Sequence, residues 1–584
     1  MGAFLLIKKP EGVDVEGVER LYKDSIGVFE KKGLSLNKKL VTDEFVIYVF
    51  HKRQFKVDNV VVFDDDQFII STGTLMYNGK MGHDALEEIY NDFSEDGKFL
   101  SDAIGEYCLI ISRKGKMYLL NDYVGLSRIY ADKKKSVISN SFLAVLKSLK
   151  TRTVSPQELY EYIIGGASYG IQTLIKEIDF LDGRTIWQIS PELSAIPKIP
   201  SVISLDKNTV FDEMVREVAK NLVDYFHIIK ENFENSVSLG LSGGYDSRLM
   251  LALLKNVGIK PLYLYVYDDS RQPTCVATAK AIAEGEGLEL DYASDNNFVQ
   301  VTADKFEAFI ETQYYFNDGL VPVFDNGFNI SHRLKRVEKA KLNLNGGCGE
   351  IYRNFWRIPH RNLSIESFVK TRYIVDFSMC TDRFDKGSYF SAFVDKIKAV
   401  LNINENRLNR RQLAMLLPFW MGRYWMGDNN TINNQISYAL TPFVDIRLAF
   451  QSFDIPLKYR NYGIFQAALI KYIDADVAKY QSHYGYNFFD DMPIKGKIPH
   501  YVKLHTPVWL RAYIRKRFWS KTDIRLKLGR KQPDIPYYLS KEYLDRIFKL
   551  SKLNLSEYID INKIKDLDIL SRMLTAELVI DNRF

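Results

Sequence analysis

A short apolar run, a pair of glycines and a helical pattern, in that order, constrain the fold of this chain more than any other feature. Residues 236–241 have the composition of a buried strand, Gly243 and Gly244 follow it, and a helical pattern covers 246–255. A second apolar strand is predicted over 261–267. Strand, glycine turn, helix and strand in succession are typical of a parallel sheet wound with helices. We therefore expect an α/β fold in the middle of the chain.

The glycine turn itself predicts a binding site for an anion. It reads Leu-Ser-Gly-Gly-Tyr-Asp-Ser over 241–247. Its glycines let the backbone approach a ligand, and the N–H groups that begin the next helix face an anion. Ser242 and Ser247 add hydroxyl donors, and Asp246, which would repel a phosphate, indicates a bridging Mg²⁺. The alternative is a turn that only joins strand to helix.

This turn differs from the kinase-type phosphate loop. That loop uses a lysine to hold the β and γ phosphates, and the 241–247 segment has none. A cradle without the lysine is better suited to a departing pyrophosphate than to a transferring γ-phosphate.

Other parts of the chain have different patterns. Residues 1–195 contain short β-branched or aromatic runs separated by turn residues, which predicts a strand-rich region. Prolines cluster over 191–200 and indicate a boundary, after which 211–233 has apolar residues at the spacing of one long helix. From 402 onward the chain is predicted to be mostly helical. In the first region we expect strands over 45–50, 60–63, 68–71, 107–112 and 117–121, and helices over 84–93 and 155–164.

Charge and cysteine content exclude several classes of protein. The chain has 79 basic and 73 acidic residues, and the difference of +6 over 584 residues is too small to indicate a nucleic-acid partner. The four cysteines lie far apart without a Cys-x-x-Cys pair, which favours reduced thiols. Three aspartates at 64–66 are expected to form a turn rather than a metal site. With no apolar run long enough for a membrane span, we expect a soluble, cytoplasmic protein.

A basic stretch with interleaved aromatic residues covers 502–530. Such a stretch could lie on an anionic membrane surface or contact a partner protein. It could equally be a solvated face that packs its aromatic side chains inward.

Several motifs together resemble the asparagine-synthetase superfamily. The 241–247 turn is similar to its ATP-pyrophosphatase loop, 344–350 to its second glycine-rich acidic turn, and 441–445 to its Pro-Phe-Leu-Asp segment. The weaker signature of its glutaminase-like domain resembles three segments of the first region, 104–107, 122–130 and 181–183.

The resemblance implies a two-domain α/β architecture. Residues 1–195 would form a degenerate glutamine-amidotransferase-like domain, an α+β sandwich of the Ntn type. Residues 205–490 would form the synthetase domain, a doubly wound parallel sheet of the ATP-pyrophosphatase type with a helical carboxyl-terminal part. Residues 491–584 would be a basic, helical extension.

The resemblance also implies an ATP-dependent ligase that forms amide bonds. A small-molecule or sugar carboxylate would attack ATP, pyrophosphate would leave, and ammonia or an amine would take the acyl group from AMP. Asp246 and Glu350 would bind Mg²⁺, Glu350 would also lie in the catalytic centre, and Lys458 is the candidate for stabilising developing charge. The residues expected to bind ATP are Leu239, Ser242, Gly243, Gly244, Asp246, Ser247, Val266 and Gly346.

The chain departs from the family pattern at two positions. Glutamine-using members begin Met-Cys, and this chain has Gly2 there, which offers no nucleophile. We therefore expect no glutaminase activity, as in members similar to β-lactam synthetases. Gly349 stands where a first carboxylate is usual, so one metal contact is missing.

Two other functions remain open. The same turn occurs in enzymes that adenylate tRNA bases, although these usually need paired cysteines and a basic RNA-binding face. A catalytically inactive relative that acts as a scaffold is the other. The amide ligase, working in specialised or surface-polysaccharide biosynthesis, is the first hypothesis.

Overall fold

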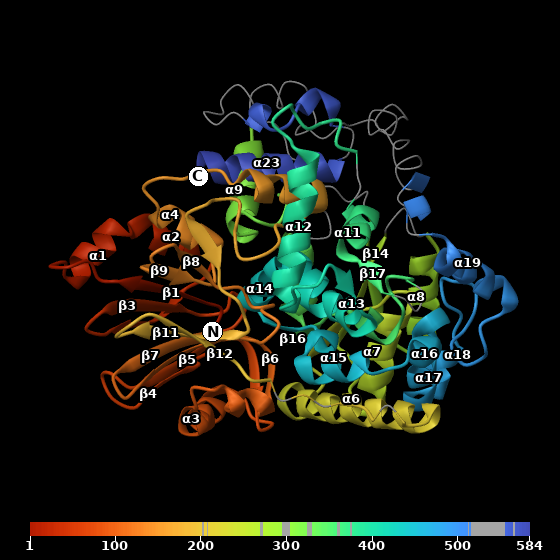
Figure 1. The fold of residues 1–584 in the computed structure, drawn as a ribbon. Coiled ribbons are helices and arrows are strands. Elements are labelled where there is room, and N and C mark those ends of the chain that lie inside the picture. The colour runs from red at the N-terminus through yellow and green to blue at the C-terminus, as the bar shows by residue number, and fades with distance from the viewer. Residues whose placement is uncertain are drawn as a thin grey trace.

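The structure, a computed structural model, is described here for residues 1–200, 202, 204–206, 208–268, 273–294, 304–323, 330–358, 362–373, 376–507, 509–511, 513–514, 555–564 and 567–584. It is a mixed α/β molecule with two antiparallel sheets, a parallel sheet and many helices. The antiparallel sheets lie on the left of Figure 1 and the parallel sheet on the right. Most of the basic stretch 502–530 lies outside the described residues.

The first 200 residues form two six-stranded sheets, with strand orders β10-β8-β9-β1-β3-β2 and β12-β11-β7-β6-β5-β4. The strands of the first sheet are β1 Ala3–Lys8, β2 Leu36–Val41, β3 Phe45–Phe50, β8 Tyr130–Asp132, β9 Val137–Ser139 and β10 Ile178–Phe180. Those of the second are β4 Val60–Val62, β5 Phe68–Tyr77, β6 Ala103–Arg113, β7 Lys116–Asn121, β11 Thr185–Ser190 and β12 Ser194–Pro197. The helices of this part are α1 Val15–Leu21, α2 Lys23–Lys31, α3 Gly82–Asp92, α4 Phe142–Ser148 and α5 Pro156–Tyr160, with a 3-10 turn at Lys98–Asp102 and a π-helix at Glu161–Gly165.

The two sheets face each other and helices cover their outer sides. In β3, Ile47 and Val49 pack between the sheets, whereas Tyr48 and Phe50 pack on the helical side. There Phe50 stacks on Phe29 of α2 with ring centroids 4.0 Å apart. Because both faces are covered, the strand is a continuous apolar run rather than an alternating one. The predicted strand 45–50 is confirmed, and the aspartates at 64–66 form the β4–β5 turn, where Asp64 accepts the Asp66 N–H.

The second half of the molecule is built on a five-stranded parallel sheet with the order β15-β14-β13-β16-β19. Its strands are β13 Val237–Gly240, β14 Tyr263–Asp268, β15 Leu290–Ser294, β16 Leu342–Leu344 and β19 Tyr438–Leu440; β17 Leu363–Ser364 and β18 Arg407–Leu408 pair separately. The long predicted helix is α6 Phe211–Phe233, and the helix after the glycine turn is α7 Tyr245–Asn256. From β13 the chain runs outward to β14 and β15, and then β16 adds on the other side of β13. This reversal is a topological switch point, where open α/β sheets bind ligands.

Helices make up most of the remainder. They are α8 Pro273–Gly285, α9 Phe306–Phe316, α10 Ile330–Glu338, α11 Ile365–Tyr373, α12 Lys386–Leu401, α13 Arg410–Leu416, α14 Gly427–Ile436, α15 Ile446–Phe453, α16 Leu457–Arg460, α17 Ile464–Ile473, α18 Ala475–Lys479, α19 Ile494–His505 and α23 Leu567–Asp581. A π-helix spans Leu417–Met426, and 3-10 turns lie at Gly349–Tyr352, Pro442–Val444, Asn461–Gly463, Leu555–Glu557 and Ile561–Lys563.

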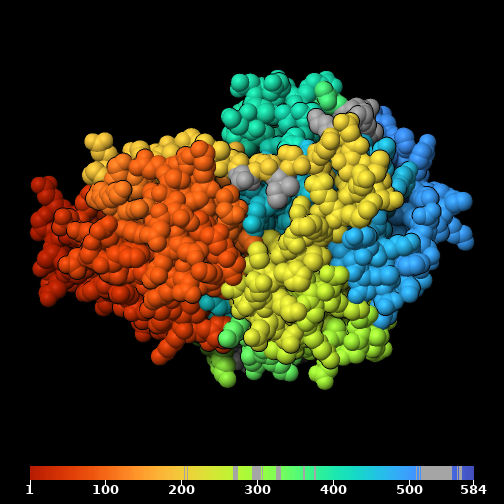
Figure 2. Space-filling model, turned by 90° about the horizontal axis from the view of Figure 1, so that it is seen from below, coloured from red at the N-terminus to blue at the C-terminus, as the bar shows by residue number. Residues whose placement is uncertain are grey.

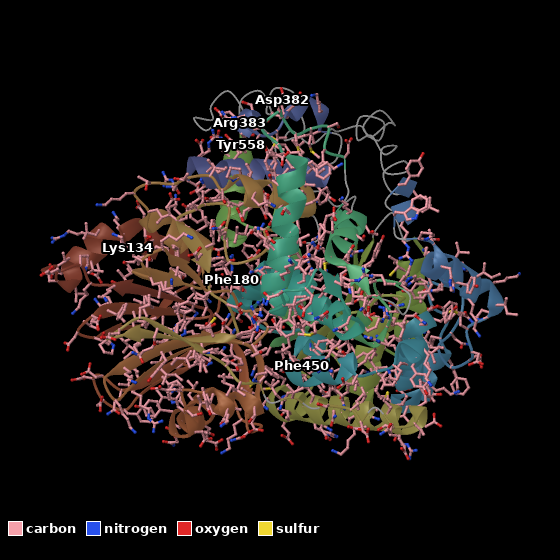
Figure 3. All side chains as sticks on the ribbon, viewed as in Figure 1. Lys134, Phe180, Asp382, Arg383, Phe450 and Tyr558 are labelled. Atoms are coloured by element: carbon pink, nitrogen blue, oxygen red, sulfur yellow. The ribbon has the colours of Figure 1, made fainter. Side chains whose placement is uncertain are left out.

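The two halves are in extensive contact. Seen from below, red-to-orange residues fill one side of the molecule and α6, in yellow, runs along the other (Figure 2). The last helix, α23, returns to the first half, where Arg572 donates to the carbonyls of Ile163 and Ile164. Tyr558 precedes α23, and the guanidinium carbon of Arg383 lies over its ring, 5.8 Å from the centroid (Figure 3). Part of the segment expected as an extension therefore packs into the core.

Within the described residues, no helix is both long and apolar enough to cross a membrane. All four cysteines are free thiols, as the sequence predicts.

Candidate functional site

The carboxyl edge of the parallel sheet brings two glycine-rich turns together. One follows β13 and leads into α7, and the other follows β16. A Cβ atom added to Gly346 would lie 3.2 Å from the backbone of Asp246 and Ser247. A Cβ at Gly349 would lie 2.5 Å from Oδ1 of Asp246, closer than real Cβ contacts come. The second turn therefore packs tightly on the first, and with Asp246 in this position a carboxylate does not fit at position 349.

Asp246 is held by residues that sequence reasoning missed. Arg353 Nη2 donates to both of its carboxylate oxygens, at 2.7 and 2.9 Å, and Gln466 Nε2 donates to Oδ1 at 2.8 Å. Arg353 lies three residues beyond Glu350, whose Oε1 is 3.8 Å from the same Nη2. Burial and the nearby Asp246 charge raise the pKa of Glu350 to about 7, against the opposing effect of Arg353. The two predicted carboxylates thus share a site, and an arginine links them.

The expected open cradle is closed in this structure. The Ser242 N–H donates to Ser247 Oγ at 2.8 Å, and the Gly243 N–H donates to Cys275 Sγ at 3.3 Å. The Gly244 N–H points to Ser242 Oγ at 3.4 Å. Neighbouring side chains thus accept from the three amides that precede α7, whereas the prediction of free donors concerned the N–H groups that begin this helix. The start of α7 has no side-chain cap.

A segment near residue 480 covers the turn. The His483 N–H donates to the Gly243 carbonyl at 3.1 Å, and a Cβ at Gly243 would lie 2.9 Å from His483 Cβ. Phe488 stacks on Tyr245 with centroids 3.9 Å apart. Arg248 donates to the carbonyls of residues 480 and 481. Burial lowers the pKa of His483, which favours its neutral form. His483 was expected to be a surface or capped core residue, and its position on the turn has no signal in the local sequence.

Other predicted residues lie apart from this contact. Leu239 pairs with Leu264 and Leu344 inside the sheet and is wholly buried. Val266 is also buried, so neither side chain presents exposed surface for adenine. Lys458 is exposed on α16 with its Nζ 4.6 Å from the ring centroid of Tyr459. In the described part of the chain, the cation on Asp246 is Arg353 and not this lysine.

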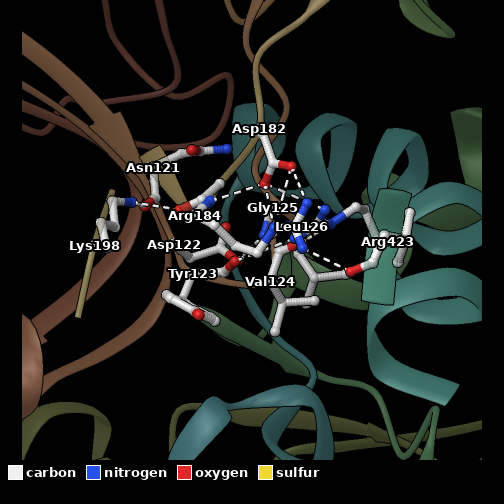
Figure 4. Close-up of polar contacts among 12 residues, drawn as sticks. Asn121, Asp122, Tyr123, Val124, Gly125, Leu126, Asp182, Arg184, Lys198 and Arg423 are labelled. Atoms are coloured by element: carbon white, nitrogen blue, oxygen red, sulfur yellow. Dashed lines mark hydrogen bonds and ion pairs between the residues drawn. The ribbon is translucent and has the colours of Figure 1, made fainter. Parts of the chain in front are cut away.

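A second group of predicted motifs meets at the junction of the two halves. Residues 104–107, 122–130 and 181–183 come together beside the turn after β19. Figure 4 shows the Asp122 turn: its carboxylate accepts the N–H groups of Gly125, Leu126 and Ser127 at 2.7–3.0 Å. Asp182 forms ion pairs with Arg184 and Arg423 in the same view.

This junction encloses a small cavity with buried titratable groups. Glu106 accepts the Thr441 N–H at 2.5 Å, and burial followed by the Asp122 charge raises its pKa to about 8. Lys198 donates to the carbonyls of Asn121 and Gly183, and burial lowers its pKa to about 7. The cavity holds about 50 Å³. That volume admits a few molecules of the size of water and no nucleotide.

The position expected for a glutaminase nucleophile has no room for one. A Cβ at Gly2 would lie 2.7 Å from the His51 carbonyl and 3.0 Å from the Gln435 carbonyl. Both are backbone atoms, so a larger residue requires the backbone to shift.

Comparison with known proteins adds little. No family model matches the chain, and no curated protein does. Solved structures that resemble it include the glutamine phosphoribosylpyrophosphate amidotransferase of B. subtilis complexed with ADP and GMP, at 10% identity and a TM-score of 0.22. Another is the allosteric regulatory enzyme of purine biosynthesis, at 11% identity and a TM-score of 0.24. Each alignment covers 53% of this chain and 70% of the other. With TM-scores this low, the likeness supports no conclusion about function.

Proposed function

We propose that the protein is an ATP-dependent ligase that adenylates a carboxylate, releases pyrophosphate and passes the acyl group to ammonia or an amine. One observation carries the proposal. The two glycine turns and the two carboxylates, Asp246 and Glu350, meet at the switch point of the parallel sheet. Ligands bind at such points in open α/β sheets because loops from both sides converge there.

The chain's own groups supply electrostatic stabilisation for this chemistry. The uncapped first turn of α7 directs N–H groups toward an anion. The hydroxyls of Ser242 and Ser247 lie 2.8 Å apart at the same place. For a pyrophosphate to reach them, His483 must move off Gly243. Binding of ATP is therefore coupled to displacement of the 480–488 segment.

Magnesium would come with ATP, whose phosphates it would neutralise as pyrophosphate leaves. Two carboxylates beside phosphate oxygens are a common ligand set for Mg²⁺. Here both oxygens of Asp246 already accept hydrogen bonds from Arg353, and position 349 has no carboxylate. The residues as arranged do not fit an ion bound by the protein, and no step of the proposal depends on one.

The first half of the chain does not supply the amine by releasing ammonia from glutamine. Gly2 has no nucleophile, and the surrounding backbone leaves no room for one. We infer that glutamine is not hydrolysed and that free ammonia, ammonia from a partner or an amine of the substrate is used.

A second candidate is an inactive relative that acts as a scaffold. The Arg353–Asp246 ion pair and the engaged amides of the glycine turn favour it, because they occupy the groups that ATP would need. The alternative of tRNA modification gains no support from the described residues, whose cysteines are unpaired.

Pyrophosphate exchange into ATP, with a panel of amino acids and uronic acids, tests the proposal. We expect exchange that depends on the carboxylate and falls at least about 100-fold, roughly 2.7 kcal/mol, in Asp246→Ala, because Arg353 then loses the carboxylate that holds it beside the glycine turn. Asp224→Ala, on the exposed face of α6, is the matched control and should retain full exchange. Exchange that only tRNA stimulates would favour tRNA modification, and ATP binding that is absent altogether would favour the scaffold.

A further inference from the structure

A separate cavity next to Glu350 is lined by an unusual number of arginines. Its walls come from the 350–356 segment, from α13 and from the end of α16. Arg353, Arg410 and Arg460 all contribute to it. Its volume of about 20 Å³ admits one water-sized group, so a larger group enters only if the walls move apart.

The guanidinium groups around this cavity have unused donors. The Nε atoms of Arg353, Arg410 and Arg460 are buried, and none has a hydrogen-bond partner in the described part of the chain. Arg460 is 6% exposed. Buried polar groups in proteins are almost always hydrogen-bonded. Three orphan donors of one kind around one cavity therefore indicate a missing acceptor.

Charges around the cavity are also unbalanced. Arg353 is paired with Asp246, and the one acceptor of Arg410 among the described residues is the Ile358 carbonyl, at 3.0 Å. Arg460 makes no ion pair among the described residues, and burial, followed by the charge of Arg410, lowers its pKa to about 10. The nearby Asp454 pairs with Arg411 through Oδ1, and its charge offsets part of that of Arg460. A buried charge that is only partly compensated is destabilising, so an anion beside Arg460 and the half-buried Arg410 would stabilise the fold.

We propose that this cavity is an oxyanion site, in which a carboxylate or phosphate group binds between Arg410 and Arg460. The planar fork of arginine matches both groups with paired hydrogen bonds. The site lies beside Glu350, so it would hold a second acidic group of the substrate while another carboxylate is activated. That assignment to the substrate rests on the proposed ligase function, whereas binding of the oxyanion itself does not.

Isothermal titration of the full chain without ATP tests the site, with inorganic phosphate and succinate as separate probes. We expect at least one of them to bind, and the tighter probe shows which oxyanion the cavity takes. Arg460→Met should weaken that binding at least about tenfold, equal to about 1.4 kcal/mol. Arg407→Met, at an exposed arginine outside the cavity, should leave it unchanged.

Thermal unfolding separates a binding role from a structural one. Without anion, Arg460→Met should melt at a higher temperature than the wild type, because it removes an uncompensated buried charge. If that variant does not fold, Arg460→Lys keeps the charge and removes the fork, and it should still lose affinity. Failure of both probes to bind the wild type, or equal binding to wild type and variants, would overturn the site. Anion binding without carboxylate-dependent exchange would support the oxyanion site and contradict the ligase function. Carboxylate-dependent exchange without anion binding would support the ligase function and contradict the oxyanion site.

Discussion

Two polar cavities of the molecule differ in whether their buried charged groups have hydrogen-bond partners. At the junction of the halves, Asp122 accepts three backbone N–H groups and Glu106 accepts the Thr441 N–H. In the cavity beside Glu350, the Nε donors of Arg410 and Arg460 have no acceptor among the described residues. The two carboxylates of the first cavity therefore have donors within the chain, whereas two arginine donors of the second have no acceptor among the described residues.

The difference distinguishes buried polar groups that stabilise the packing of the chain from buried polar groups that bind a ligand. A fully satisfied buried network fixes how elements pack, and removing one member leaves its partners unpaired. An unsatisfied one costs stability unless a ligand completes it. We infer that the junction holds the halves together and that the parallel-sheet edge is where ligands bind.

The largest expected effect is at the junction. Asp122→Ala would leave three N–H groups without an acceptor and Lys198 without its buried counter-charge. We expect a loss of about 3–5 kcal/mol of unfolding free energy, measured by urea denaturation. Asp65→Ala, in the exposed β4–β5 turn, should stay within about 0.5 kcal/mol of wild type. Equal effects of the two substitutions would mean that the hydrogen bonds and charge of Asp122 do not stabilise the fold.

A smaller loss is expected where the two glycine turns touch. Gly349→Ala places a Cβ 2.5 Å from the Asp246 carboxylate. Overpacking of this kind costs about 1–3 kcal/mol, measurable by thermal unfolding. Gly27→Ala in α2, where a Cβ meets nothing within 4 Å, should instead stabilise the protein by about 0.5–1 kcal/mol. A neutral Gly349→Ala would mean that the turns pack less closely than described.

The smallest effect is expected for Glu106→Gln near pH 5. There the variant should differ from wild type by about 1 kcal/mol or less, because even the unfolded wild type gains little by ionising. Toward pH 8 the variant should become the more stable protein, because the unfolded wild type ionises while Glu106 in the folded protein, with a pKa of about 8, stays mostly protonated.

The pH dependence of the same pair is more informative. The folded state holds the Glu106 proton where the unfolded state, with a pKa near 4.5, has lost it. The contribution to stability is complete below pH 4.5 and declines as pH rises toward 8, by up to about 1.4 kcal/mol per unit. Unfolding free energies measured from pH 5 to 8 should show this decline in wild type and less of it in Glu106→Gln. An identical pH dependence of the unfolding free energy in the two proteins would mean that Glu106 is more exposed to water than described.

Local sequence patterns predicted the regular elements well. The amphipathic spacing of 211–233 is α6, residue for residue, and the apolar run 45–50 is β3. The predicted helix 155–164 instead changes from α to π geometry at Glu161. Burial of one face of an element produces periodic apolar residues in its sequence, and this period can be recognised without knowing the rest of the fold.

The details of the site could not be predicted in this way. Arg353 lies 107 residues from Asp246, and His483 contacts the glycine turn from a segment that is still more remote in the sequence. Such contacts depend on how elements pack, and no spacing rule encodes them. The sequence identified the turns that meet at the sheet edge, but not the remote residues, Arg353 and His483, that contact them.

Equilibrium binding of ATP to the wild type and to His483→Ala tests the central claim most directly. If the turn after β13 is a nucleotide site that His483 covers, the wild type binds ATP and the variant binds it more tightly, by about threefold or more, because the covering side chain is gone. If neither protein binds ATP at millimolar concentration, the sheet edge is not a nucleotide site and the account is wrong.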